Sequence, residues 1–177
     1  VTDAVDKLCK IFDALKPKSL ELENLKLGQF QIFRIDLNKA LLFEDKQKAQ
    51  QYLALIKEHG TYPRRKREVE NNGIYFGKGS TRTTLLYYYK GKEVDSHKKQ
   101  QVNLTPELKT YADRMVRCEV RLFSQHLRDQ DLQYGYCWNE DLIKELIEGY
   151  HDLLNLPEPI SDLDLPSKFI RFLAANK

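Results

Sequence analysis

The sequence of 177 residues lacks the features that mark membrane, zinc-finger and disulfide-stabilised proteins. No apolar run approaches the ~20 residues that a membrane-spanning helix needs, and no signal peptide is visible. The three cysteines lie far apart without a CxxC spacing, which argues against a zinc knuckle or a disulfide framework and favours a reducing compartment. The four histidines form no HxH pair, so they offer little as metal ligands. We therefore expect a cytoplasmic protein with no membrane partner.

Charge of both signs is present but unevenly distributed along the chain. The net charge is only +3, with 41% hydrophobic and 31% charged residues, a composition typical of a soluble globular protein. Residues 61–100 carry ten Lys or Arg against four Asp or Glu, whereas residues 123–177 carry five against ten. A basic middle and an acidic tail indicate that a polyanion approaches one side of the molecule. A solvated surface with uneven charge is the simpler alternative.

The length suits one domain, with a core over residues 1–155 and an extension over residues 156–177. Because the first residue is Val rather than Met, we expect that a segment precedes it. Apolar periodicity and turn residues predict helices over about 2–15, 44–59, 105–113, 124–132, 139–154 and 166–175, and strands over about 29–37, 73–77, 82–90 and 115–122. The basic stretch 61–72 is expected to be a loop.

The order of these elements predicts an α+β fold. Its central part matches a ferredoxin-like split β-α-β-β-α-β antiparallel sheet with helices on one face. On the first strand, alternation directs Phe33, Ile35 and Leu37 to the helices and directs Arg34 and Asp36 to the other face. That second face is free to bind a ligand.

Three of the predicted strands each carry one reactive side chain among apolar neighbours, namely Asp36, Tyr88 and Glu119. If these strands pair, the three side chains converge on the uncovered face, together with Arg34, Arg117 and Arg121. Charged groups on central strands are costly to bury, so they must be paired, metal-bound or facing a cleft. Tyr87 and Tyr89 fall on the opposite face and are expected to belong to the core.

Two carboxylates and a phenol on one face are the groups needed for metal-assisted attack on a phosphodiester. A Mg²⁺ ion held by Asp36 and Glu119 would stabilise the charge of the transition state, and attack by Tyr88 would give a phosphotyrosine linkage. Lys90 shares the face of Tyr88, and Lys92 would share it if the strand ran through Gly91. Either lysine would neutralise the phosphate or lower the pKa of the phenol.

Each of these features also has a structural interpretation. Asp36 and Glu119 can simply pair with the neighbouring arginines across the strands. A tyrosine on a strand such as Tyr88 is commonly a packing residue, because tyrosine is a good strand former. The run from Arg64 to Arg67 is typical either of a phosphate-contacting loop or of a solvated one.

In their order and spacing, three motifs resemble the gene II/gene X family of filamentous-phage replication initiators, a branch of the rolling-circle (HUH-like) endonucleases. The motifs are Arg34-Ile-Asp36, the stretch Arg82-Thr-Thr-Leu-Leu-Tyr-Tyr88 that leads into Lys90, and Met115-Val-Arg-Cys-Glu119-Val-Arg121. The resemblance runs from the first helix to about residue 154. It implies an enzyme that nicks one strand at a replication origin and becomes joined to the 5′ phosphate through tyrosine. It also implies Mg²⁺ or Mn²⁺ as cofactor and a host helicase as partner.

Carried over to this chain, the resemblance makes Tyr88 the nucleophile and Asp36 and Glu119 the metal ligands, with Lys90 or Lys92 at the phosphate. The His-hydrophobe-His motif of the wider superfamily is absent. Single-stranded origin DNA, in the cytoplasm of a bacterial host, would be contacted by basic residues. The predicted set is Arg34, Arg64, Arg65, Lys66, Arg67, Arg82, Arg117 and Arg121.

Two other functions remain open at this stage. A non-catalytic module would use the same sheet as a platform for single-stranded nucleic acid, but it has no use for Asp36 and Glu119 on the binding face. A conjugative relaxase would share the chemistry and differ in its biological role.

Overall fold

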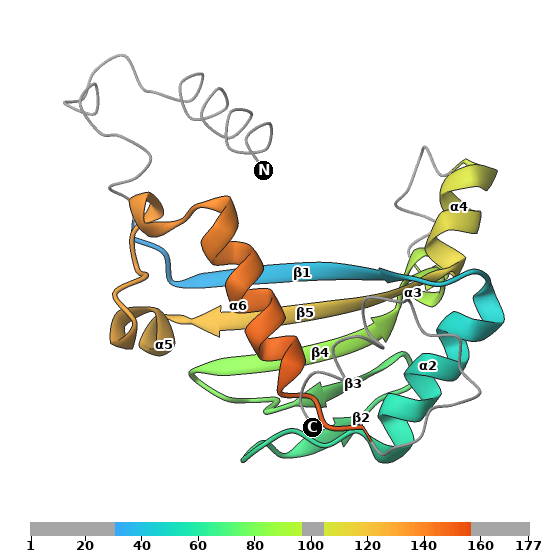
Figure 1. Cartoon of the computed structure of the whole chain (residues 1–177), viewed down its shortest axis with the longest axis horizontal. Helices are drawn as coiled ribbons and strands as arrows, with labels where there is room; N and C mark the ends of the chain where they lie inside the picture. Colours follow the sequence, from blue (N-terminus) through green and yellow to red (C-terminus); the bar gives the residue numbers. More distant parts are fainter. Residues whose placement is uncertain (1–30, 97–104, 157–177) are drawn as a thin grey trace.

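The computed structural model describes residues 31–96 and 105–156, whose strands form one five-stranded sheet (Figure 1). The strands are β1 (Arg34–Leu42), β2 (Arg67–Val69), β3 (Gly73–Phe76), β4 (Thr83–Tyr89) and β5 (Met115–Phe123). The helices are α2 (Lys46–His59), α3 (Lys90–Ser96), α4 (Pro106–Asp113), α5 (Ser124–Asp129), the short 3-10 helix η3 (Gly135–Cys137) and α6 (Glu140–Asp152). All neighbouring strands are antiparallel, so the predicted α+β class and antiparallel sheet are confirmed.

The order of the strands, β1-β5-β4-β3-β2, differs from the ferredoxin-like split arrangement that the sequence predicted. In a split β-α-β unit, a helix joins two parallel strands that have a third strand between them. Here α3 and α4 join β4 to β5, and these two strands are direct antiparallel neighbours. The reason is that α3 and α4 lie together at one end of the sheet and do not cross its face (Figure 1). As a result β5 lies between β1 and β4.

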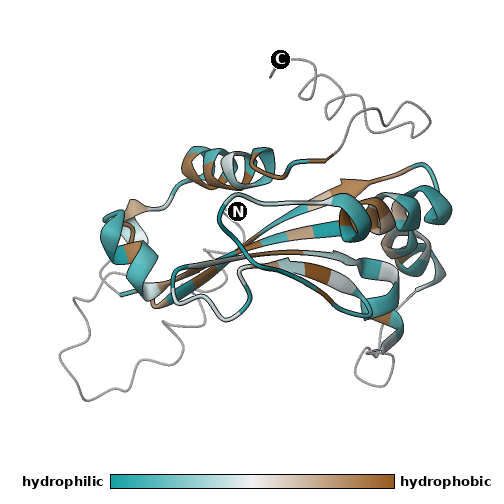
Figure 2. Ribbon diagram, turned by 90° about the horizontal axis from the view of Figure 1, so that it is seen from below, coloured by the Kyte–Doolittle hydropathy of each residue, from teal (hydrophilic) through white to brown (hydrophobic). Residues whose placement is uncertain are grey.

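Helices α2 and α6 pack on one face of the sheet and enclose the hydrophobic core with it (Figure 1). Along β5, Val116, Cys118, Val120 and Leu122 point into this core and are completely buried, whereas the residues between them are only partly buried. Brown and teal segments alternate along the strands in Figure 2, because successive side chains of a strand point to opposite faces. The charged residues of β5 therefore lie on the face that α2 and α6 leave free.

Side-chain caps begin three of the helices. Asp45 accepts a hydrogen bond from the backbone N–H of Lys48 at the start of α2, at 2.8 Å. Thr105 and Asn139 cap α4 and α6 in the same way. Gly60 ends α2, close to the predicted end of that helix.

The first strand begins and ends later than predicted. It runs over residues 34–42 instead of 29–37, because it pairs with β5 along its whole length, from Arg34 opposite Phe123 to Leu42 opposite Met115. This pairing draws the polar residues at positions 38 and 39 into the strand. Phe33, which was predicted to face the helices, lies outside the strand and is 65% exposed.

Three further elements, β2, α3 and the short helix η3, were not predicted. The segment 61–72, expected to be a loop, contains β2, which pairs with β3. The stretch after β4 forms the helix α3 directly, where the sequence predicted an irregular connection. Within this helix, position 91 is a glycine because Asp113 and the ring of Tyr89 leave no room there for a side chain.

The helices predicted over 2–15 and 166–175, and most of the C-terminal extension, lie outside the described residues. Within residues 31–96 and 105–156, none of the helices combines the length and the apolar character of a transmembrane segment.

Candidate active site

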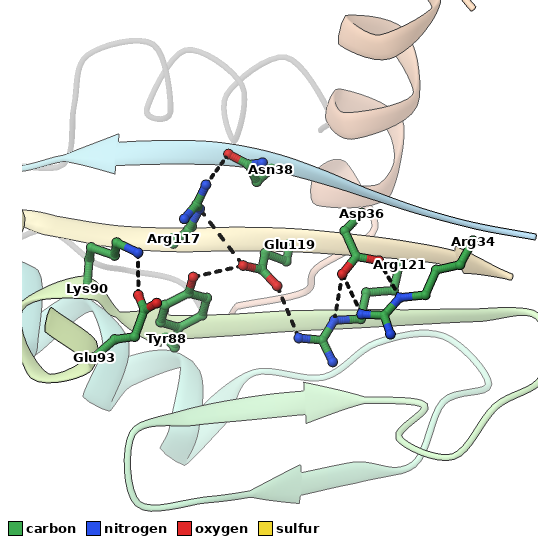
Figure 3. A network of polar contacts seen from close by, with 9 residues as sticks. All are labelled: Arg34, Asp36, Asn38, Tyr88, Lys90, Glu93, Arg117, Glu119 and Arg121. Atoms are coloured by element: carbon green, nitrogen blue, oxygen red, sulfur yellow. Dashed lines mark hydrogen bonds and ion pairs between the residues drawn. The ribbon is translucent and has the colours of Figure 1, made fainter. Parts of the chain in front are cut away.

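Three neighbouring strands, the edge strand β1 and the inner strands β5 and β4, bring the predicted reactive side chains to the face that α2 and α6 leave free. In the register of the sheet, Asp36 on β1 lies opposite Arg121 on β5, and Tyr88 on β4 lies opposite Arg117 on β5. Glu119 lies between these two arginines on the same face of β5. The structure therefore brings Asp36, Tyr88 and Glu119 together on one face (Figure 3).

Tyr88 is held directly against Glu119. Its hydroxyl group donates a hydrogen bond to Oε1 of Glu119 at 2.8 Å. Only 8% of Tyr88 is exposed, although it lies outside the helix-covered core. Burial, followed by the hydrogen bond to Glu119 and the negative charge of that residue, raises the pKa of Tyr88, and Arg117 opposes this effect. The phenol is consequently protonated at neutral pH, with a carboxylate positioned to accept its proton.

Arginine side chains join the two carboxylates into one network (Figure 3). The Nη2 of Arg121 donates to Oε2 of Glu119 at 3.1 Å, and its Nε lies 3.6 Å from Oδ2 of Asp36. Arg34 makes two hydrogen bonds to Asp36, at 2.7 and 2.5 Å. Arg117 donates to Oδ1 of Asn38 at 2.7 Å and lies 3.9 Å from Glu119. The carboxylates therefore pair with the arginines that the structural interpretation of the sequence named, but of these ion pairs only that of Arg121 with Asp36 crosses from one strand to the next. The other ion pairs join residues two positions apart on the same strand.

Comparison with known proteins identifies the family. A family model described as the N-terminal part of a replication-associated protein, the phage gene II protein, matches residues 1–141. The chain belongs to this family. Membership makes it a rolling-circle replication initiator of the filamentous-phage gene II type, as the three sequence motifs indicated. Searches of curated proteins and of solved structures found no match.

The residues of the initiator do not, as arranged here, form a site for a divalent metal ion. Among residues 31–96 and 105–156, no three His, Cys, Asp or Glu side chains come close enough to hold one. The two predicted ligands, Asp36 and Glu119, have the oxygen donors that Mg²⁺ prefers. However, a guanidinium group lies between them, and every carboxylate oxygen of the pair already contacts an arginine or Tyr88. Three arginines against two carboxylates leave this cluster with an excess of positive charge.

A cavity of about 270 Å³ opens beside Tyr88 on the same face. Its lining consists of Glu70, Asn72, Gly73, Tyr75, Leu86, Tyr88, Glu93, Glu119 and Arg121. This volume can hold one nucleobase or one phosphate group, but not a larger ligand. Through this cavity a ligand can reach the otherwise buried Tyr88.

The sequence analysis singled out only Tyr88, Glu119 and Arg121 among the residues that line this cavity, and Glu93 and Asn72 are among those it missed. Glu93 forms an ion pair with Lys90 at 2.5 Å. Its signal in the sequence is the i, i+3 spacing from Lys90 at the start of α3, which is recognisable only if a helix is predicted there. Asn72 precedes β3 at the turn after β2 and carries no such signal.

The two candidate lysines lie in different places. Strand β4 ends at Tyr89, so alternation does not extend to either lysine. The Nζ of Lys90 lies 6.0 Å from the centre of the Tyr88 ring, near the site. Lys92 donates to Oδ1 of Asn71 at 2.5 Å and does not join the contacts of Tyr88. Lys92 would share the face of Tyr88 only if β4 continued through Gly91, and the strand ends before that residue.

Several of the basic residues predicted to contact DNA have partners within the fold. Arg65 donates to Oγ of Ser80 at 3.2 Å and to the hydroxyl group of Thr83, and thus fixes the turn between β3 and β4. Arg67 donates to the carbonyl oxygen of Glu58 at 3.0 Å, near the end of α2. Arg82 forms an ion pair with Asp129 of α5. From the sequence alone, arginines that stabilise the fold could not be distinguished from arginines that are free to contact DNA.

Arg64, Lys66 and Arg67 are exposed, but of these only Arg67 donates a hydrogen bond to a backbone carbonyl group in the described part of the chain. Arg64 has a positive φ of 57°, a backbone conformation that is uncommon outside glycine, and makes no polar contact within the described residues. Lys66 lies 3.6 Å from Glu68, with 82% of its side chain exposed. These two side chains are available to an approaching phosphate backbone.

Proposed function

We propose that this initiator nicks and rejoins one strand of origin DNA by transesterification at Tyr88. The observation that supports the proposal is the 2.8 Å hydrogen bond between the Tyr88 hydroxyl group and Glu119, beside a cavity and between Arg117 and Arg121 on the same sheet face. This distance is within the ~2.6–3.2 Å expected between a reacting group and its general base.

In the proposed reaction, the phenolic oxygen of Tyr88 forms a bond to the phosphorus of the scissile phosphodiester while its proton passes to Glu119. The bond from phosphorus to the 3′ oxygen breaks, and this oxygen leaves as a hydroxyl group after taking a proton from solvent. The products are a 5′-phosphotyrosine linkage and a free 3′ hydroxyl end for the polymerase. In the reverse reaction a 3′ hydroxyl group attacks the phosphotyrosine, which rejoins the strand.

Arginine side chains supply the positive charge for this reaction. Arg117 and Arg121 flank Glu119, and their side chains are 28% and 27% exposed, so a phosphate can reach both. Charge-assisted hydrogen bonds from guanidinium groups to phosphate oxygens strengthen as negative charge develops in the transition state. Further along the strand of DNA, Arg64 and Lys66 contact phosphates, which positions the substrate without reading its sequence.

The proposal includes a divalent ion, Mg²⁺ or Mn²⁺, which would supply additional polarisation of the phosphate when bound. No step of the scheme above depends on it, because Asp36 and Glu119 are engaged by arginines. A host helicase is proposed to open the duplex, and the initiator would act in the cytoplasm of the bacterial host.

The proposal is tested with a labelled single-stranded origin oligonucleotide and Mn²⁺, followed by a search for an SDS-resistant protein–DNA adduct. The Tyr88→Phe variant should lose the adduct and still bind the oligonucleotide. The matched control is Tyr75→Phe, because Tyr75 lines the same cavity and should not be required.

Two outcomes would contradict the proposal. An adduct that persists in Tyr88→Phe and maps to another tyrosine would remove Tyr88 as the nucleophile. Binding without any adduct, in wild type and with either metal, would favour the non-catalytic binding module. An adduct that forms equally well after chelation with EDTA would remove only the divalent ion from the scheme.

A further inference from the structure

We infer that Arg121 is an internal cation that occupies the position between Asp36 and Glu119 and competes with a divalent metal ion for these two carboxylates. The inference rests on the proposed use of a divalent ion by this site. It assigns to Arg121 a positioning role that is distinct from simple phosphate binding.

The geometry places Arg121 at the centre of the site. Its guanidinium group contacts both carboxylates, with 3.1 Å to Glu119 and 3.6 Å to Asp36, and no other side chain drawn in Figure 3 does so. Asp36 lies directly opposite Arg121 in the register of β1 and β5, and Glu119 precedes it by two residues on the same strand face. A metal ion bound by both carboxylates would have to lie where this guanidinium group now lies.

The contacts of Arg121 are also exchangeable. They are longer than the 2.5 Å contact between Arg34 and Asp36, and Nε of Arg121 is buried without a hydrogen bond of its own. Arg121 lines the cavity beside Tyr88, so its guanidinium group needs only to turn toward that cavity to meet a phosphate. A phosphate oxygen is a good acceptor for a guanidinium group, so Arg121 stays paired with an anion when it exchanges a carboxylate for a phosphate.

Arg121 competes with a divalent ion for the carboxylates and is also attracted by a DNA phosphate. These two effects predict that binding of DNA and binding of the divalent ion are thermodynamically linked. A phosphate that draws Arg121 away leaves Asp36 and Glu119 with less positive charge beside them, so a divalent ion binds more tightly when substrate is present. The site would then acquire its metal ion with the DNA rather than before it.

The test is the affinity for Mn²⁺ alone, measured in the absence of DNA by isothermal titration and by the electron paramagnetic resonance signal of free Mn²⁺. Removal of the competing charge in Arg121→Gln should tighten Mn²⁺ binding on the order of tenfold. The gain should disappear in the double variant Asp36→Asn/Arg121→Gln, which lacks one of the two carboxylates.

The matched control is Arg117→Gln. It removes the same charge from the same face of β5, but Arg117 lies 3.9 Å from Glu119 and does not contact Asp36. Its gain in Mn²⁺ affinity should be at most about threefold, the effect of a nearby charge that does not compete for the position. If Arg121→Gln lowers the melting temperature too far for titration, Arg121→Lys serves instead. A lysine ammonium cannot contact both carboxylates as the guanidinium fork does, so an intermediate gain is expected.

Equal Mn²⁺ affinity in wild type and in Arg121→Gln would overturn the inference, and so would a gain that survives in the double variant. Because no DNA and no strand cleavage enter this measurement, it can fail while the Tyr88 adduct is still observed. Conversely, loss of the adduct from Tyr88→Phe says nothing about Mn²⁺ affinity, so the two proposals fail separately.

Discussion

Replacement of Glu119 by Gln tests the proton transfer in the proposed reaction. The amide has the same size and its carbonyl oxygen can still accept the hydrogen bond of Tyr88, but it cannot take the proton. We expect the rate of nicking at neutral pH to fall about 10²–10⁴-fold, the range that a positioned general base contributes. Oligonucleotide binding should be retained, because Arg117 and Arg121 remain on the sheet face.

The same substitution changes the ionisation of Tyr88 in a defined direction. The hydrogen bond and the negative charge of Glu119 both raise the pKa of Tyr88, and burial raises it most. In Glu119→Gln the pKa of Tyr88 should therefore fall, while burial still holds it above its ordinary value. Since a phenolate needs no base, the nicking rate of the variant should recover as the pH is raised, more steeply than that of the wild type.

The assay is single-turnover nicking of a labelled oligonucleotide across the neutral and alkaline range. Tyrosinate absorbance, compared between Glu119→Gln and Glu119→Gln/Tyr88→Phe, isolates Tyr88 among the ten tyrosines of the chain. The control is Glu70→Gln. This variant removes a carboxylate that lines the same cavity but pairs with Lys78 rather than Tyr88, so it should nick at nearly the wild-type rate. Wild-type activity in Glu119→Gln at neutral pH would refute the role of Glu119 as base. A loss that alkaline pH does not repair, despite a lowered Tyr88 pKa, would refute it as well.

Two further predictions concern the fold and the DNA contacts. Burial lowers the pKa of His151, which contacts the hydroxyl group of Tyr87 at 2.5 Å, from 6.5 to about 4, a shift equivalent to ~3 kcal/mol. Because buried His151 resists protonation in the folded state, the free energy of unfolding is highest above pH 6.5 and decreases by this amount as the pH falls from 6.5 toward 4. Urea titrations should show the decrease, and His151→Phe should remove most of it. Arg64→Gln and Lys66→Gln should each lower the slope of log affinity against log salt by ~0.7 for single-stranded DNA, at an unchanged melting temperature. Arg65→Gln should instead destabilise the fold by ~1–3 kcal/mol, since it breaks partly buried hydrogen bonds to Ser80 and Thr83, and an unchanged melting temperature would contradict its structural role.

The face of each strand was predictable from the sequence because a strand has a period of two. In the stretch Met115–Leu122, every second residue is apolar, so the position of Glu119 on the outer face followed directly. The same rule separated Tyr88 from Tyr87, which packs in the core. The meeting of Asp36 with Arg121 on one face also followed from alternation, once the strands were taken as neighbours.

What the sequence could not supply was tertiary pairing. The length of β1 depends on its partner β5, which holds polar residues such as Asn38 in the strand. The order of the strands depends on α3 and α4 lying at the end of the sheet. Helix α3 escaped prediction because its glycine, aspartate and serine have low helix propensity and Val94 is its only apolar side chain, so it shows no apolar periodicity. Arg65 and Arg64 are neighbours in one basic run, and only the turn between β3 and β4 makes the first structural and leaves the second exposed.

The charged face reconciles the two interpretations of its carboxylates, as ion-pair partners and as reactive groups. Side chains of Asp36, Glu119 and Arg121 are only 35%, 15% and 27% exposed, so an uncompensated charge there would destabilise the sheet. Arginine partners are therefore needed for folding before any substrate arrives. The strongest contact, two hydrogen bonds from Arg34 to Asp36, lies at the edge strand, away from Tyr88. The contacts around Glu119, at 3.1 and 3.9 Å, are longer and lie beside the phenol. A phosphate that enters the cavity thus meets Arg121, whose contacts with the two carboxylates are longer than those of Arg34, and a group that stabilises the site without substrate becomes a group that binds the substrate.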